Sequence, residues 1–502
     1  MSNATLPSEP LVAPHRPNPI IVRDFPGWLP AMLVKELRQG LRTRGFVGTL
    51  LGFQLVLLVL TLIALSTQNQ GTNGARAASA LLSGFFWLVV GVQLLVVTPA
   101  RALGGLQGEI DARTIDLLML TRLSAWRVVL GKWVSLLAQA TLLLIAMMPY
   151  MVVRYFTDNA DVAGDLGVCV TLLGISGVLT AAGLWGSGVE TRLVRVFTRI
   201  LPIVVMVNFV GVLAPLFAGR GTFSRGPFAA VFESPLDILN GALVTAFFLV
   251  CAVRNIAPPA ENHSLWLRVL PLLALAAAPL VAVLGAHALA VRQLYMAAVF
   301  LGLVLISELG GGRTSMATHW RSWYARGAWS RIAGRLAMPG WPSAFLFGLL
   351  AMSAWTAVAL LVLPTGAAAT REYAAWLAFL GLAGITFPAV LQSFVRPVPV
   401  PRTLLYFIGL AIPASLTALA VALAESPLKI TGLKAVMEVV PFSSFLLGLN
   451  ERPSGEVTYV AQGILALGVL LAAGWRSRDY WRKLKSFEAQ DREPAGPATG
   501  LS

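Results

Sequence analysis

Residues 80–100 read ALLSGFFWLVVGVQLLVVTPA and contain no charged side chain. A helix needs roughly 20 consecutive apolar residues to cross the hydrocarbon core of a bilayer, so this stretch is long enough to span one. The whole chain has the same character, with 57% hydrophobic and 12% charged residues and a mean hydropathy of +0.75. A soluble domain carries about a quarter charged residues. The sequence therefore predicts an all-α, polytopic membrane helix bundle.

Similar apolar runs recur along the chain and predict about 12 transmembrane helices. They lie near residues 46–66, 80–100, 128–153, 166–189, 196–218, 236–253, 269–287, 293–307, 343–363, 373–395, 403–424 and 456–474. With the N-terminus inside, 29 of the 38 Lys and Arg residues fall on the inner side. Such a bias marks the cytoplasmic side of a membrane protein. We therefore expect a multi-pass protein of the cell (inner) membrane with both termini in the cytoplasm.

Composition also argues against several functions. The net charge of +15 comes from short basic clusters beside apolar runs, which favours the lipid bilayer as the partner and predicts no nucleic-acid binding. Cys169 and Cys251 lie inside apolar runs, and the four histidines are scattered, so no disulfide framework or metal-ligand spacing is present.

The charged segment between the second and third apolar runs is GEIDARTIDLLMLTRLSAWRVVLGKW, residues 108–133. Ile110, Leu117 and Leu118 recur at helical spacing, opposite charged positions. This pattern predicts an amphipathic helix at the cytoplasmic membrane surface. Ser124 can cap a new helix that leads into the third span, and Lys132 can extend from that helix to the inner interface.

The residue identities in this segment resemble those of the ABC-2 type transporter permease family. The matching positions are Glu109, Asp111, Thr114, Asp116, Leu117, Leu118, Thr121, Leu123, Ser124, Val129, Leu130, Gly131 and Lys132. Three positions depart from the family pattern, since Ile110, Arg113 and Arg122 stand where the family has Arg, Gly and Pro. Taken with the features that precede it, the resemblance covers roughly residues 30–254.

The resemblance implies a coupling helix at 107–124 that docks on a separate ABC ATP-binding subunit. It assigns the contact to charged residues of that helix, which are Glu109, Asp111, Arg113, Asp116 and Arg122. The residues before the first span look like the family's amphipathic elbow helix, with Lys35, Glu36, Arg38, Arg42 and Arg44. Without the family, the same residues would be read as a basic anchor for anionic headgroups. The chain itself is then no enzyme and carries no cofactor, because ATP and Mg²⁺ belong to the partner.

The chain divides by this interpretation into four parts. These are a cytoplasmic tail with the elbow (1–45), a first six-helix module (46–254), a second six-helix module (255–475) and a basic cytoplasmic tail (476–502). Residues 308–342 occupy in the second half the place of the coupling segment in the first. They are basic and aromatic, and are either a membrane-apposed loop or a degenerate second coupling helix. A single chain suffices if the halves are repeats; otherwise a homodimer or a second permease is needed.

Residues 433–450 are too short and too interrupted by Pro441 to cross the membrane. The family has a short re-entrant helix at this position, at the outer gate, whereas the residues alone suggest an interfacial helix.

Two other functions remain open at this stage. An ATPase-independent, ion-coupled transporter needs ionisable groups in mid-membrane, but the spans hold mainly amides, and Asp237 and Glu308 fall at helix ends. An integral membrane enzyme of lipid or glycan metabolism needs clustered catalytic groups, whereas the outer acids Asp158, Asp161 and Asp165 suggest a solvated turn. No Gly-x-x-x-x-Gly-Lys-Ser/Thr motif occurs, so ATP hydrolysis by that route requires a partner.

Overall fold

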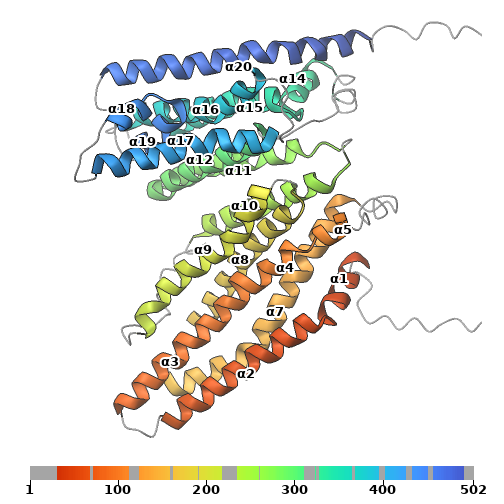
Figure 1. The fold of residues 1–502 in the computed structure, drawn as a ribbon, viewed down its shortest axis with the longest axis vertical. Coiled ribbons are helices and arrows are strands. Elements are labelled where there is room, and N and C mark those ends of the chain that lie inside the picture. The colour runs from red at the N-terminus through yellow and green to blue at the C-terminus, as the bar shows by residue number, and fades with distance from the viewer. Residues whose placement is uncertain are drawn as a thin grey trace, which may run out of the picture.

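The computed structural model describes residues 31–67, 72–111, 124–158, 162–189, 192–217, 234–258, 261–309, 323, 327–363, 368–394, 402–425, 432–449 and 456–490. Every regular element in these residues is a helix, which confirms the predicted all-α bundle (Figure 1). Eleven helices of the described part are long and apolar enough to cross a membrane. The fifth predicted span, 196–218, overlaps helix α9 but is not among those eleven.

In its described residues the first half of the chain contains six long helices and four short ones. Their bounds are α1 Ala31–Leu41, α2 Arg44–Thr67, α3 Thr72–Gly91, η2 Val92–Val97, α4 Thr98–Leu103, α5 Gln107–Asp111, α7 Ala125–Asp158, α8 Val162–Ser187, α9 Arg192–Phe217 and α10 Pro235–Ile256. Helices α3, η2 and α4 follow one another without a break and form the second span. The η2 segment is a π-helix in which the backbone N–H of Thr98 donates to the carbonyl of Gln93.

The second half also contains six long helices, with three short ones at its two ends. Their bounds are α11 Ser264–Val283, α12 His287–Leu309, α14 Ala328–Ala337, α15 Trp341–Val362, α16 Ala368–Phe394, α17 Arg402–Glu425, α18 Gly432–Met437, α19 Pro441–Gly448 and α20 Glu456–Gln490. The last long helix, α20, continues as one helix past residue 475 and into the predicted basic tail as far as Gln490.

The long helices of the two halves pack in the same order. The six long helices of each half are counted here in chain order, with α3, η2 and α4 as one helix. In each half the first helix contacts the second and third, and the second contacts the third and fourth. The third contacts the fourth and sixth, and the fourth contacts the fifth and sixth. The halves meet where α10 packs against α11 and α12. One large apolar core includes Phe247 and Val250 of α10 together with Phe300 of α12 and Trp355 of α15. The predicted boundary at residue 254 therefore separates two halves that share this apolar core.

The short helices mark the two ends of the bundle. Helices α1, α5 and α14 and the C-terminal end of α20 lie at one end, and α18 and α19 lie at the other (Figure 1). Residues 433–450 form α18 and α19, and Pro441 is the first residue of α19. Helix α19 packs against α16, α17 and α20, and its Ser443 and Ser444 are fully buried. It is therefore wedged among the long helices.

Candidate functional site: the polar end of the bundle

The described part of the predicted coupling segment is helix α5 and Ser124, and α5 lies at the end of the bundle that carries α1 (Figure 1). Glu109 and Asp111 belong to α5, which forms the first turn of the expected amphipathic helix. Arg113, Asp116 and Arg122 lie outside the described residues. Helix α7 begins directly after Ser124, whose carbonyl accepts the backbone N–H of Arg127 at 2.9 Å. The predicted start of the third helix is thus confirmed.

Lys35, Glu36 and Arg38 of the predicted elbow lie on helix α1, which packs along α7, whereas Arg42 follows α1 and Arg44 begins α2. Lys35, Arg38, Arg42 and Arg44 are exposed. Glu36 has a different role, because its Oε1 lies 3.3 Å from Nζ of Lys132 near the start of α7. Lys132 is therefore buried and paired, and the expectation that it extends to the membrane interface is wrong.

Arg101 joins three helices next to the coupling segment. Its guanidinium donates to the Thr49 hydroxyl at 2.8 Å and the Gly45 carbonyl at 3.1 Å on α2, and to the Gln139 side chain at 3.5 Å on α7. It also lies over the Phe46 ring, 5.7 Å from the ring centroid. Together with the Lys132–Glu36 pair, these bonds tie α1, α2, α4 and α7 into one unit.

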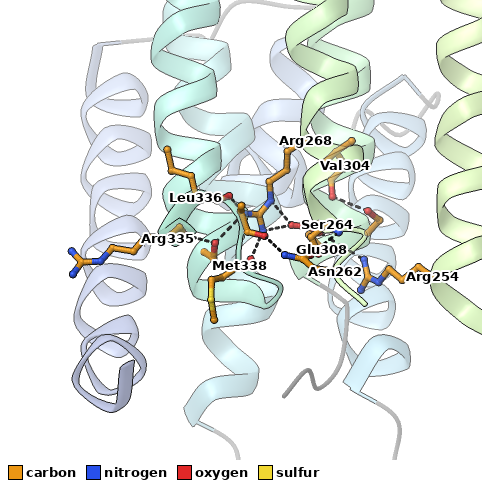
Figure 2. A network of polar contacts seen from close by, with 12 residues as sticks. Arg254, Asn262, Ser264, Arg268, Val304, Glu308, Arg335, Leu336 and Met338 are labelled. Carbon is orange, nitrogen blue, oxygen red and sulfur yellow. Dashed lines mark hydrogen bonds and ion pairs between the residues drawn. The ribbon is translucent and has the colours of Figure 1, made fainter. Parts of the chain in front are cut away.

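The corresponding end of the second half holds a buried ionic cluster (Figure 2). Nε of Arg268 on α11 donates to Oε2 of Glu308 on α12 at 2.7 Å, and Nη2 also contacts Oε2. The side chains are 3% and 2% exposed. Arg254 of α10 lies 3.9 Å from Oε1 of the same carboxylate. Glu308 therefore connects the last helix of the first half to the first two helices of the second.

Arg268 also fixes α14, the short helix that precedes α15. The last carbonyl groups of a helix have no partner within the helix, and a cation near them is favoured by the helix dipole. At α14 side chains supply the missing donors. Arg268 donates to Leu336 O and Met338 O, Ser343 Oγ donates to Arg335 O, and Asn262 Nδ2 donates to Ala337 O (Figure 2).

The outward face of α14 is apolar. Trp329 is 85% exposed and Ile332 is 54% exposed, whereas Arg335 lies 3.7 Å from Glu488 of α20. Just beyond α14, Met338 packs with Trp323 and with Trp481 and Leu484 of α20. Helix α14 is thus held rigidly while it presents an apolar face away from the protein.

Charged residues are also buried at the opposite end of the bundle, where the sequence suggested a solvated turn. Asp165 lies in the first turn of α8 and is buried, with Oδ2 2.7 Å from Nη1 of Arg154 on α7. Nε of Arg154 donates to the Ser83 hydroxyl of α3 at 3.1 Å, and its guanidinium lies over the Phe86 ring. The expectation for Asp165 is therefore wrong, because α7 extends to Asp158 and α8 begins at Val162, so that Arg154 and Asp165 both fall inside helices.

The helix-end acids Asp237 and Glu308 are likewise buried and paired. Asp237 completes a capping box with Ser234 at the start of α10 and contacts Arg292 of α12. One turn further, the side-chain amides of Asn240 and Gln293 exchange two hydrogen bonds of 3.0 and 3.1 Å. The sequence did contain a signal for the Asp237–Arg292 pair. The two residues have opposite charges, and both lie at the outer ends of predicted spans.

The described residues contain no group of three or more His, Cys, Asp or Glu that could hold a metal ion. Both cysteines are free and buried. A chain of long apolar helices, with its charges placed near the helix ends and paired there, is a multi-pass membrane protein. Comparisons with known protein families, with curated proteins and with solved structures found no match.

Proposed function

We propose that the chain is the membrane permease component of an ATP-driven transporter, and that it exports its substrate with a separate ATP-binding subunit. The observation that carries the proposal is the segment at 107–124, which resembles an ABC-2 coupling helix and connects α4 to α7. The absence of a P-loop motif in the sequence agrees with hydrolysis of ATP in a partner.

The ties around the segment give it a mechanical role. When ATP binding closes the partner, the segment moves with it and carries α4 and α7. Because Arg101 and the Lys132–Glu36 pair join these helices to α2 and α1, the four helices move as a unit. The partner binds the two arrangements of the bundle with different affinity. This difference in affinity shifts the equilibrium between the inward- and outward-facing states.

Orientation in the membrane follows from the charges. The Lys and Arg bias puts 107–124 and both termini in the cytoplasm, where ATPase subunits are found. The cell membrane is the proposed location, and the second half supplies the other helical module of the same permease.

The test is co-purification from native membranes in a mild detergent, with the proteins that accompany the chain identified by mass spectrometry. We expect a P-loop ATPase to accompany the wild type, and Glu109→Lys with Asp116→Lys to reduce its recovery. Glu456→Lys, at the opposite end of the bundle, is the matched control and should retain it. Recovery of no P-loop ATPase would favour an ATPase-independent transporter or a membrane enzyme, and unchanged recovery with the double variant would remove 107–124 from the contact.

A further inference from the structure

One amide in the middle of the second span has no hydrogen-bond partner. Gln93 is 1% exposed, and neither its side-chain nitrogen nor its side-chain oxygen makes a hydrogen bond. Comparable amides are satisfied, since Gln54 donates to the Ala146 carbonyl and Gln293 exchanges hydrogen bonds with Asn240. An unpaired amide is costly to bury, so Gln93 calls for a partner that the protein itself does not supply.

Two hydroxyl groups on α8 share this property. Ser176 and Thr180 are fully buried, and neither hydroxyl makes a hydrogen bond. Helical Ser and Thr residues of this chain usually donate to a carbonyl three or four residues earlier, as Thr171 does to Gly167 on α8 itself at 3.0 Å. Ser176 and Thr180 are four residues apart, so they lie on one face of α8.

Helix packing puts Gln93 and Ser176 at a similar depth, and Thr180 one turn nearer to the same helix contact. Helix α8 packs against both α4 and η2, and Gly183 sets the register, because a Cβ there would lie 3.0 Å from Ala102 Cβ and from the Pro99 carbonyl. Ser176 comes seven residues before Gly183. Gln93 comes six residues before Pro99 on a helix that runs in the same direction. Two helical turns therefore separate both positions from the same contact.

The backbone at Gln93 is also irregular. Gln93 belongs to the π-helix η2, where the Thr98 hydroxyl donates back to the Gln93 carbonyl at 2.9 Å. Short π-helical insertions in long helices are frequent at functional sites. The surroundings are apolar, with Leu94 and Leu95 of η2 and Leu172 and Leu179 of α8 in one core cluster.

We propose that Gln93, Ser176 and Thr180 form a binding site for a neutral, hydroxyl-bearing molecule halfway across the first module. An amide and two hydroxyls offer both donors and acceptors and no net charge, which suits the hydroxyl groups of water or of a polyol. Only the identity of the molecule that passes through the site rests on the proposed transport function. Its test requires no ATPase, so the two proposals fail separately.

Cysteine reactivity measures access of polar solutes to the site. Cys169 and Cys251 are first replaced by Ala, and Ser176→Cys is then treated with a small neutral methanethiosulfonate. The thiolate is the reactive species, so we expect Ser176→Cys to react on the order of tenfold faster than two controls on the same helix. These are Val170→Cys, at an outward-facing position, and Ala181→Cys, at a fully buried one.

The outcome decides the proposal and identifies the occupant. Labelling of Ser176→Cys that slows in the presence of sucrose assigns the site to a hydroxyl-rich solute, and labelling that sucrose leaves unchanged assigns it to water. A rate no faster than that of Ala181→Cys would overturn the proposal.

A second variant tests the site without a probe. If the amide of Gln93 is bonded to an occupant, Gln93→Leu leaves the melting temperature unchanged or lowers it. If the amide is dry and unpaired, Gln93→Leu raises the melting temperature, because removal of an unsatisfied buried group is stabilising, and the proposal is then wrong. Gln54→Leu is the matched control and should lower the melting temperature, since it loses the bond to Ala146.

Discussion

The ionic cluster of Arg268 and Glu308 allows a quantitative prediction, because the two residues make different sets of contacts. Glu308 pairs with Arg268 and Arg254, whereas Arg268 also donates to two carbonyl groups at the end of α14 (Figure 2). Removing one member of a buried ion pair costs about 3 to 5 kcal/mol. We expect a loss of that size for Glu308→Met.

Arg268→Met should cost more, about 5 kcal/mol or above, because it leaves Glu308 buried beside the partly exposed Arg254 and also orphans the carbonyls of Leu336 and Met338. The double variant Arg268→Met/Glu308→Met removes the unpaired charge and should recover about 3 kcal/mol relative to Arg268→Met. It should not reach wild-type stability, because the α14 carbonyls still lack donors.

The assay is reversible unfolding in mixed micelles, followed by tryptophan fluorescence. Asp479→Asn is the control for an exposed pair, since Asp479 and Arg482 are 3.7 Å apart and 64% and 78% exposed, and its change should stay within about 1 kcal/mol. The reasoning is refuted if Glu308→Met loses less than about 1 kcal/mol, or if the double variant is no more stable than Arg268→Met.

Three further predictions concern the elbow helix α1, the buried helix α19 and the apolar face of helix α14. Lys132→Met should free the elbow from α7 and speed trypsin cleavage after Lys35 and Arg38. The exchanged pair Glu36→Lys/Lys132→Glu should restore protection. Equal cleavage of the wild type and both variants would show that this ion pair does not hold the elbow on α7. A Cβ at Gly384 would lie 2.8 Å from the Cα of Phe442 in α19, so Gly384→Ala should lower the free energy of unfolding by about 1 to 3 kcal/mol, while Gly468→Ala, with nothing within 4 Å, should leave it unchanged or raise it by up to about 1 kcal/mol. A spin label at Ile332 of α14 should be reached by oxygen more readily than by a water-soluble nickel chelate in bilayers, because an amphipathic helix in the interface buries its apolar face; the reverse order would show that α14 faces water.

The sequence was sufficient for the architecture because apolar runs of spanning length carry a strong signal. Each of the twelve predicted spans overlaps a helix, and α7 begins directly after Ser124 as predicted. The ends were less predictable. Helix α20 runs on to Gln490 because Trp481 and Leu484 pack against Met338, a contact between residues far apart in the sequence.

The polar contacts could not be predicted from helical spacing alone. Asp165 was expected in a solvated turn and Glu308 at a helix end. Their partners Arg154 and Arg268 lie on other helices, and only the packing shows that the pairs are buried. The pairing of Glu36 with Lys132 joins residues 96 positions apart in the chain. Of the coupling residues, Glu109 and Asp111 fall on α5 as expected, and their contact with an ATPase stays a prediction.

The central claim is that residues 107–124 contact an ATP-binding subunit. Photo-crosslinking from position 116 in native membranes tests it most directly, with a photoreactive residue in place of Asp116 and the same residue at position 456 as the control. We expect a protein adduct at 116 that contains a P-loop ATPase and none at 456. Adducts at 116 with lipid alone, or with proteins that lack a nucleotide-binding motif, would contradict it.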